Sequence, residues 1–118
     1  MDRFDGLPLL LDPIPDFRRA GMPAGERPEL WCPAHPEPAV RLLSEGPGAG
    51  AKTICAPTLC ANRFCLPGED IPSLNQRLAA LARGAAGKVP LGALVGPSGR
   101  FVPPLGEADF DDVYEGYR

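Results

Sequence analysis

The stretch Asp70-Ile-Pro-Ser-Leu-Asn-Gln-Arg-Leu-Ala-Ala-Leu-Ala-Arg-Gly84 carries the strongest secondary-structure signal of the chain. Its leucines recur at spacings of four and three residues, which places them on one face of an α-helix: Leu74, Leu78 and Leu81. Asp70 or Ser73 is a suitable N-cap, and Gly84 is typical of the residue just past a helix end. We predict a helix from residue 71 or 72 to residue 83, with its leucine face in the core.

Downstream of this helix, residues 89–102 predict a β-hairpin. Two apolar runs, 91–95 and 100–102, flank the turn-forming sequence Gly96-Pro-Ser-Gly99. Pro103-Pro104 ends the second run, because proline has no backbone N–H to donate within a sheet. We therefore expect a short antiparallel pair of strands here.

The tail formed by residues 107–118 combines acids with aromatic side chains. Five acids against one base give it a net charge of −4, so the rest of the chain is close to neutral. Its aromatic and apolar residues are of the kind found at the centres of interfaces: Phe110, Val113, Tyr114 and Tyr117. We expect the tail to dock on a protein partner with a basic groove, and a frayed, solvated terminus is the alternative.

Upstream, residues 1–30 contain five prolines, each of which favours extended or turn backbone in its neighbours. We predict an extended arm here. Its large apolar side chains are too many for a solvated linker, so we expect them to pack on their own domain or on a neighbouring subunit: Phe4, Leu7, Leu9, Leu10, Leu11, Ile14 and Phe17. Between the arm and the central helix, we expect a short helix at 38–44 and a brief strand at 52–55.

All four cysteines and the only histidine lie between residues 32 and 65. Cys32-Pro-Ala-His35 has the two-residue spacing that lets both side chains reach one metal ion, and Cys55-x4-Cys60-x4-Cys65 offers three further thiols. Thiolate sulfur and neutral imidazole are ligands that zinc prefers. We predict a structural zinc knuckle formed by four of these five residues: Cys32, His35, Cys55, Cys60 and Cys65.

Other states of the same cysteines stay open. Four thiolates without the histidine can hold an iron–sulfur cluster, although the plant-type pattern C-x4-C-x2-C differs from this chain at its second gap. Two disulfides become possible if the protein is exposed outside a reducing compartment. Free cysteines can also pack as small apolar residues. Metal analysis with a visible absorption spectrum separates zinc from a cluster.

Composition and motifs argue against several function classes. The 12 Lys and Arg against 15 Asp and Glu give a net charge of −3, which offers no attraction for nucleic acid or an anionic membrane. No stretch approaches the roughly 20 apolar residues that span a bilayer, and no signal peptide is visible, so we expect a soluble protein. We expect it in the cytoplasm, or in the virion if it is a phage structural protein. Residues 46–53 resemble a P-loop, but they lack the preceding strand and the following helix. No residue set indicates catalysis, because neither Cys32 nor His35 has an orienting acid.

These features predict a small, irregular α+β fold: a loop-rich, metal-stapled domain with one or two short helices, a β-hairpin and extended terminal arms. We divide it into a proline-rich arm (1–30), a metal-knuckle core with the helix and hairpin (31–106) and an acidic aromatic tail (107–118). We expect a non-enzymatic structural or accessory subunit that docks through its arms into a larger protein assembly, either a multisubunit complex or a virion. An iron–sulfur electron-transfer protein is the alternative.

Overall fold

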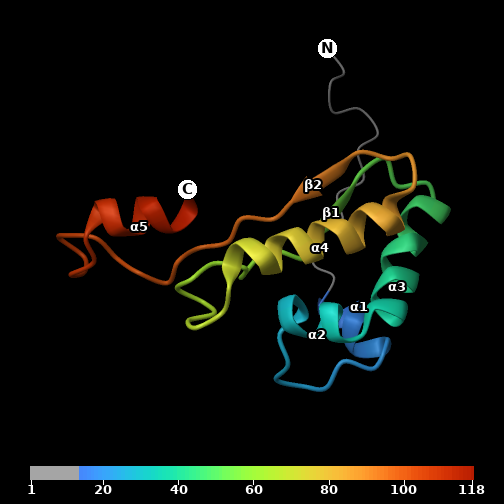
Figure 1. Cartoon of the computed structure of the whole chain (residues 1–118), viewed down its shortest axis with the longest axis horizontal. Coiled ribbons are helices and arrows are strands. Elements are labelled where there is room, and N and C mark those ends of the chain that lie inside the picture. The colour runs from blue at the N-terminus through green and yellow to red at the C-terminus, as the bar shows by residue number, and fades with distance from the viewer. Residues whose placement is uncertain (1–13) are drawn as a thin grey trace, which may run out of the picture.

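The computed structural model of the chain describes residues 14–118 (Figure 1). These residues form five helices and one two-stranded parallel sheet, a small α+β fold as expected. In chain order the elements are α1 (Ile14–Arg19), α2 (Pro28–Ala34), α3 (Pro36–Gly48), β1 (Ile54–Ala56), α4 (Ile71–Ala86), β2 (Leu91–Ala93) and α5 (Phe110–Tyr117). Every helix of this described part is too short or too polar to cross a lipid bilayer.

Helix α4 lies at the centre of the fold and confirms the strongest prediction. Asp70 caps it, because its carboxylate accepts a hydrogen bond from the backbone N–H of Ser73 (3.2 Å). Leu74 and Leu78 are buried and Leu81 is half-buried. The helix continues beyond the predicted stop because further buried residues extend the same face: Ala82, Ala85 and Ala86. Gly87, with a φ of 61°, ends it instead of Gly84.

The other helices of the core pack around α4. Helix α3 packs on α4 and on β1, α2 packs on both α3 and α4, and α1 packs on α3 (Figure 1). Helix α3 is longer than the predicted 38–44, since Pro36 occupies its first turn, where a missing N–H does no harm. The largest fully buried side chains come from four different elements: Phe17, Cys32, Ile54 and Leu78.

The predicted hairpin over residues 89–102 is wrong. Residues 91–93 do form a strand, β2, but its partner is β1 and the pairing is parallel, with Ile54 opposite Leu91 and Ala56 opposite Ala93. Helix α4 is the crossover that a parallel pair requires. Gly96 does not form a hairpin turn. It lies where two backbone segments come close together. A Cβ added to Gly96 would lie 2.1 Å from the carbonyl oxygen of Leu59, so the chain runs on past that loop.

The predicted arm at 1–30 lies in part outside the described residues, which begin at residue 14. Within the described part, α1 and the first turn of α2 are helical. The side chains of Phe17 and Met22 are 0% and 3% exposed and belong to the core. This portion of the arm therefore packs on its own domain, one of the two arrangements expected for it.

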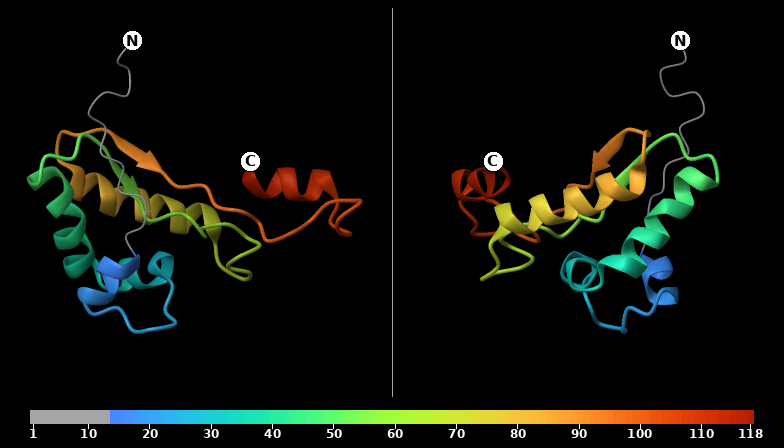
Figure 2. Two further views of the ribbon diagram at one scale, coloured as in Figure 1. Left: turned by 180° about the vertical axis from the view of Figure 1, so that it is seen from behind. Right: turned by 45° about the vertical axis from the view of Figure 1, so that its right-hand side comes forward.

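Helix α5 lies apart from the rest of the fold. Both views in Figure 2 place it away from α1, α2 and α3, at the far end of a long connection from β2. It makes no extensive contact with any other described helix or strand. The tail is thus a formed helix, and Asp109 caps it by accepting a hydrogen bond from the backbone N–H of Asp112 (3.0 Å).

Candidate functional site

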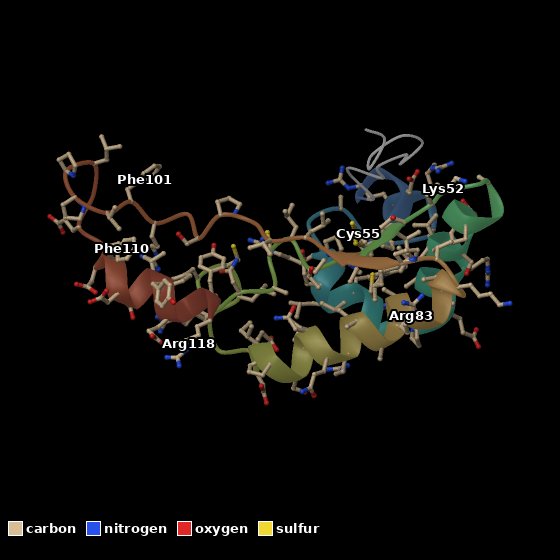
Figure 3. All side chains as sticks on the ribbon, turned by 90° about the horizontal axis from the view of Figure 1, so that it is seen from above. Lys52, Cys55, Arg83, Phe101, Phe110 and Arg118 are labelled. Carbon is tan, nitrogen blue, oxygen red and sulfur yellow. The ribbon has the colours of Figure 1, made fainter. Side chains whose placement is uncertain are left out.

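The most unusual surface of the molecule lies between residues 95 and 117. Seven large apolar side chains in this segment are exposed, and we call them the C-terminal surface: Val95, Phe101, Val102, Leu105, Phe110, Tyr114 and Tyr117. Leu105 is 82% exposed and Phe110 is 67% exposed, whereas other large apolar side chains of the chain are buried in the core. Helix α5 contributes three of these residues and buries none of its own. Figure 3 places Phe101 and Phe110 at the end of the molecule opposite Lys52 and Arg83.

A few specific contacts with one loop fix the position of α5. The guanidinium of Arg63 donates to the carboxylate of Asp112 (2.7 Å) and stacks over the ring of Phe64, 4.9 Å from its centroid. The ring of Phe64 also lies 6.2 Å from that of Tyr117, whose hydroxyl donates to the backbone carbonyl of Gly96 (2.6 Å). These contacts hold one side of the helix and leave Phe110 and Tyr114 facing outward.

Phe110 and Tyr114 form the outer face of α5. They are four residues apart, so they lie on the same side of the helix, and their rings stack with centroids 6.4 Å apart. Acids flank this aromatic pair in the sequence, at positions 107, 109, 111, 112 and 115. The segment therefore presents a pair of stacked aromatic rings within an acidic stretch of sequence.

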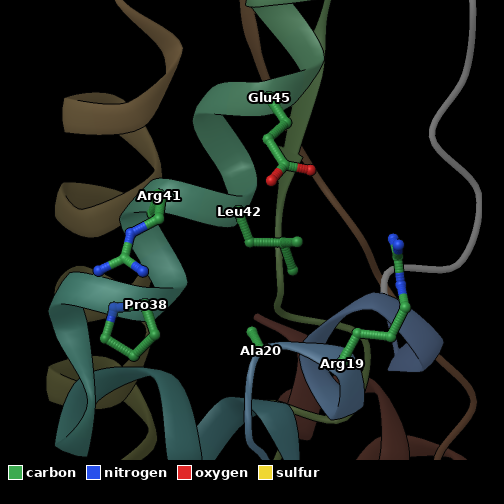
Figure 4. A pocket seen from close by; sticks show the side chains of 6 residues that line it. All are labelled: Arg19, Ala20, Pro38, Arg41, Leu42 and Glu45. Atoms are coloured by element: carbon green, nitrogen blue, oxygen red, sulfur yellow. The ribbon is translucent and has the colours of Figure 1, made fainter.

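A groove of about 840 Å³ adjoins the C-terminal surface. The first half of α4, the chain after β2 and the end of α5 line it, and Val95 and Tyr117 belong to both features. A smaller hollow of about 270 Å³ lies between α1 and α3, where Arg19 and Arg41 stand on opposite sides of Leu42 (Figure 4). The larger groove extends the apolar C-terminal surface, whereas the smaller hollow is lined by side chains of both charges, Arg19, Arg41 and Glu45.

The second feature with chemical potential is the loop 58–66, which carries Cys60 and Cys65. Three polar side chains fix its backbone. The carboxylate of Glu29, 3% exposed, accepts from the N–H of Cys60 (2.9 Å), and the amide of Asn75 donates to the carbonyl of Ala61 (3.1 Å). Asn62 accepts from the N–H groups of residues 64 and 65 (3.0 and 2.9 Å), which closes a tight turn.

This turn carries both Cys60 and Cys65, five positions apart in the chain. Burial raises the pKa of the Cys60 thiol, and the Glu29 carboxylate and Cys65 add to the rise, while the charge of Arg27 opposes it. The sulfur of Cys65 also receives a hydrogen bond from the side-chain amide of Asn62 (3.5 Å) and donates to the carbonyl of Pro97 (3.6 Å). Both cysteines, like Cys55, are partly buried.

The structure does not bring the five predicted zinc ligands together. Cys32 faces the core with 0% exposure, and burial raises the pKa of its thiol to about 12, with a further contribution from Glu29. His35 ends α2 on the outside, where its ring stacks on Trp31 at 4.8 Å. Among residues 14–118, no three Cys, His, Asp or Glu side chains form a group that could hold a metal ion. All four cysteines are free thiols.

The zinc knuckle and the iron–sulfur cluster therefore gain no support from the fold. The reason is local geometry. Cys32 and His35 have a spacing that suits a knuckle loop, but the first lies within a helix and the second just beyond its end, so one points inward and the other outward. Cys55 lies in β1, away from the turn that joins Cys60 to Cys65.

Three residues that build the site were not singled out in the sequence analysis. Glu29 bonds a backbone group 31 positions further along the chain, and no local pattern signals such a contact. Asn62 was recognisable in principle, since asparagine commonly closes turns through its side chain. Gly116 is a third: it permits α5 to approach Phe64, and an added Cβ would lie 2.3 Å from that ring.

Comparison with known proteins adds no relative to this picture. No protein-family model matches the chain, and no curated protein matches it. The function has to be argued from the C-terminal surface and the cysteine loop themselves.

Proposed function

We propose that this chain is a non-enzymatic docking subunit that binds a larger protein assembly through its C-terminal surface. One observation carries the proposal. Seven of the eight exposed large apolar side chains in the described residues fall within 95–117. Single exposed apolar residues are normal on any protein, but a concentration of them in one segment is typical of an interaction site.

The chemistry of the segment specifies the partner. Phe110 and Tyr114 are anchors of the aromatic type that dominates binding energy at interface centres. The tail around them carries a net charge of −4. A complementary partner therefore offers an apolar groove with a basic rim, into which the outer face of α5 fits as an amphipathic helix.

Helix α5 is also prepared for binding. Its N-cap at Asp109 and its contacts with Arg63 and Phe64 fix a helix that would be too short to form alone in water. A segment already ordered in its bound form loses less conformational entropy when it binds. The groove beside Val95 and Tyr117 extends the apolar contact toward the core domain.

The test compares two double variants of the full-length chain, each with an N-terminal tag and expressed in the cells from which the protein comes. Phe110→Ser with Tyr114→Ser removes both anchors, whereas Gln76→Ala with Arg77→Ala alters an exposed face of α4 as a matched control. Native extracts are separated by size, and the amount of tagged protein in large complexes is measured. Loss of two aromatic anchors costs about 2 kcal/mol or more each, so we expect the first variant to leave the complex and the control to remain.

Circular dichroism and melting temperature establish that both variants fold. If the wild-type chain runs as a monomer in native extract, or if the anchor variant stays in the complex in wild-type amount, the docking proposal is wrong.

A further inference from the structure

We propose that the open edge of β2 binds an extended segment of a protein partner, which joins the sheet as a third strand and places apolar side chains in the adjoining groove. This contact differs from the docking proposed above, because it is made by the backbone of residues 91–95 and not by the outer face of α5. Either contact can therefore fail while the other holds.

The sheet is open on the side of β2. It consists of two strands, whereas stable sheets generally need a third strand or a helix packed against them. Helix α4 runs alongside both strands, and α3 packs on β1 (Figure 1). Among the described helices, only α4 packs extensively on β2. In this part of the chain, the edge of β2 that faces away from β1 therefore has no strand and no further helix beside it.

The backbone groups at this edge are unpaired. The carbonyl of Pro90 accepts from the N–H of Ile54 in β1 (3.2 Å). The backbone N–H and carbonyl of Leu94 both bond to the hydroxyl of Thr58, just past β1 (3.0 and 2.8 Å). In a parallel pair, alternate residues bond the neighbouring strand, and the residues between them direct their N–H and C=O groups to the opposite side. Residues 91, 93 and 95 therefore direct theirs outward, and no loop, helix or side chain among residues 14–118 bonds to them.

An extended peptide is the kind of partner that suits this edge. Unpaired N–H and C=O groups at every second residue form a template for another strand, which offers its own groups at the same spacing. Domains that bind peptides by adding a strand to an open sheet edge use this arrangement. A helix does not fit, because its backbone groups are already bonded to each other. We therefore expect an extended segment without proline at the residues that bond β2.

The groove determines which side chains the segment carries. Leu91 and Ala93 lie opposite Ile54 and Ala56, so all four point to the same face of the sheet. Ile54 and Ala56 are buried there, whereas Ala93 is exposed. The groove of about 840 Å³ opens at this place, between residues 91–96 and the first half of α4. Every second side chain of an added strand enters this groove, so large apolar residues are expected at those positions.

Two observations favour a different protein over a second copy of this chain. Antiparallel pairing of two β2 edges about a central two-fold axis would place the two Ala93 residues opposite each other, and methyl groups would fill little of the groove. Glu69 and Asp70 line the groove where α4 begins, and within residues 14–118 no ion pair engages them. The two arginines of the groove are each paired with an acid of α5. A basic residue near one end of the bound segment complements this charge.

Peptide selection on the full-length chain tests the inference. A display library of random peptides about 12 residues long is selected on the protein, held by an N-terminal tag. We expect the enriched peptides to alternate apolar and polar residues, with no proline between them and with Lys or Arg near one end. The peptide that binds best is then synthesised, and its Kd is measured by calorimetry.

Hydrogen exchange of single amides, followed by NMR, locates the bound peptide. In the free chain, the amides of Ala93 and Val95 should exchange faster than that of Leu94, which is bonded to Thr58. Saturation with the peptide should slow the exchange of Ala93 and Val95 about ten-fold or more, because both acquire acceptors. Ala93→Pro removes one outward N–H without removing a bond to β1, so we expect it to weaken peptide binding about ten-fold.

Two N-methylated forms of the peptide provide the matched control, and they leave the protein unchanged. In one form the odd-numbered amides are methylated, and in the other the even-numbered amides. Only one set can face β2, so one form should lose binding and the other should keep it. Equal effects of both forms would contradict strand addition, whether or not Ala93→Pro folds.

Three further results would overturn the inference. The first is that no peptide is enriched on the wild-type chain. The second is slow exchange of Ala93 and Val95 in the free, dilute protein, which would mean that the chain itself already covers this edge. The third is a dimer that forms with rising concentration and protects the same two amides, which would make a second copy the occupant.

Discussion

Glu29 connects the core to the cysteine loop through a single side chain. Its carboxylate is 3% exposed and accepts from the backbone N–H of Cys60. Burying such a group is unfavourable unless it is hydrogen-bonded, and the negative charge also raises the pKa of the Cys32 and Cys60 thiols. The same residue thus fixes the turn and disfavours the reactive form of two neighbouring cysteines.

Two substitutions separate these roles. Glu29→Gln keeps an oxygen that can accept from Cys60 and removes the charge, so we expect little change in unfolding free energy and faster alkylation of Cys60. Glu29→Ala leaves the N–H of Cys60 without its partner and should cost roughly 1–3 kcal/mol. Urea denaturation and timed alkylation with mass analysis measure the two effects. Equal stability of both variants would contradict the assigned hydrogen bond.

Cys32 predicts a loss of stability in alkaline solution. Burial raises the pKa of its thiol from the ordinary 9.0 to about 12. Because the folded pKa is the higher one, the stabilising contribution is complete below about pH 9 and is lost as the pH rises through about 12. By pH 11 the loss should reach roughly 2–3 kcal/mol.

The measurement compares urea unfolding of the wild type and of Cys32→Ala at pH 8 and pH 11. All other ionisable side chains are common to both proteins, so only the difference between the two pH slopes reports on Cys32. We expect a steeper fall for the wild type. Parallel curves would mean that the Cys32 thiol ionises as readily in the folded chain as in the unfolded one.

At the scale of elements, local signals and long-range pairing behave differently. Helix α4 could be predicted because its cap at Asp70 and its leucine spacing are contained within one stretch of sequence. The partner of β2 could not be predicted, because Leu91 pairs with Ile54, 37 positions earlier in the chain. An apolar run does not by itself indicate which other strand it pairs with. Helix α5 was not predicted, because its alternation of acids and aromatic residues is compatible with both a short amphipathic helix and an extended peptide.

Helices α4 and α5 offer a matched pair of glycine substitutions. Alanine favours helices over glycine by roughly 1 kcal/mol, so Gly84→Ala in α4, which has no atom within 4 Å of the added Cβ, should be stabilising. Gly116→Ala places its Cβ 2.3 Å from the Phe64 ring, so α5 should shift away from Arg63 and Phe64 despite its better helix propensity. Hydrogen exchange of the α5 amides should accelerate only in Gly116→Ala. Unchanged exchange there would contradict the packing of α5 on Phe64.

For the molecule as a whole, the sequence predicts the α+β class but not what stabilises the fold. Proline and glycine make up 30 of 118 residues, which favoured a metal staple as the support for a loop-rich chain. The fold instead encloses an apolar core from α1 to β2, with Cys32 as one of its members. Clustering of cysteines along the chain did not become clustering of all four in space, because α2 directs Cys32 inward and Cys55 lies in β1, outside the turn that carries Cys60 and Cys65.

Treatment with chelators distinguishes a fold stabilised by its apolar core from one stabilised by a zinc site. The apolar core predicts that EDTA and 1,10-phenanthroline leave the melting temperature unchanged, since the described side chains form no metal group whose loss would loosen the fold. A structural zinc site would contribute roughly 10 kcal/mol, so its removal should unfold the chain. Metal analysis of the same sample completes the measurement, and release of one zinc per chain with a lowered melting temperature would restore the zinc knuckle.

If the chain docks as proposed, a partner covers the C-terminal surface in the assembled state. Hydroxyl-radical footprinting of the native complex tests this coverage. Oxidation of Phe110 and Tyr114 is compared between the purified chain and the chain in its assembly, with Trp31, 4% exposed in the core, as an internal reference. We expect labelling of both anchors to fall several-fold in the assembly, while that of Trp31 does not change. Equal labelling of Phe110 and Tyr114 in the free and assembled states would contradict it.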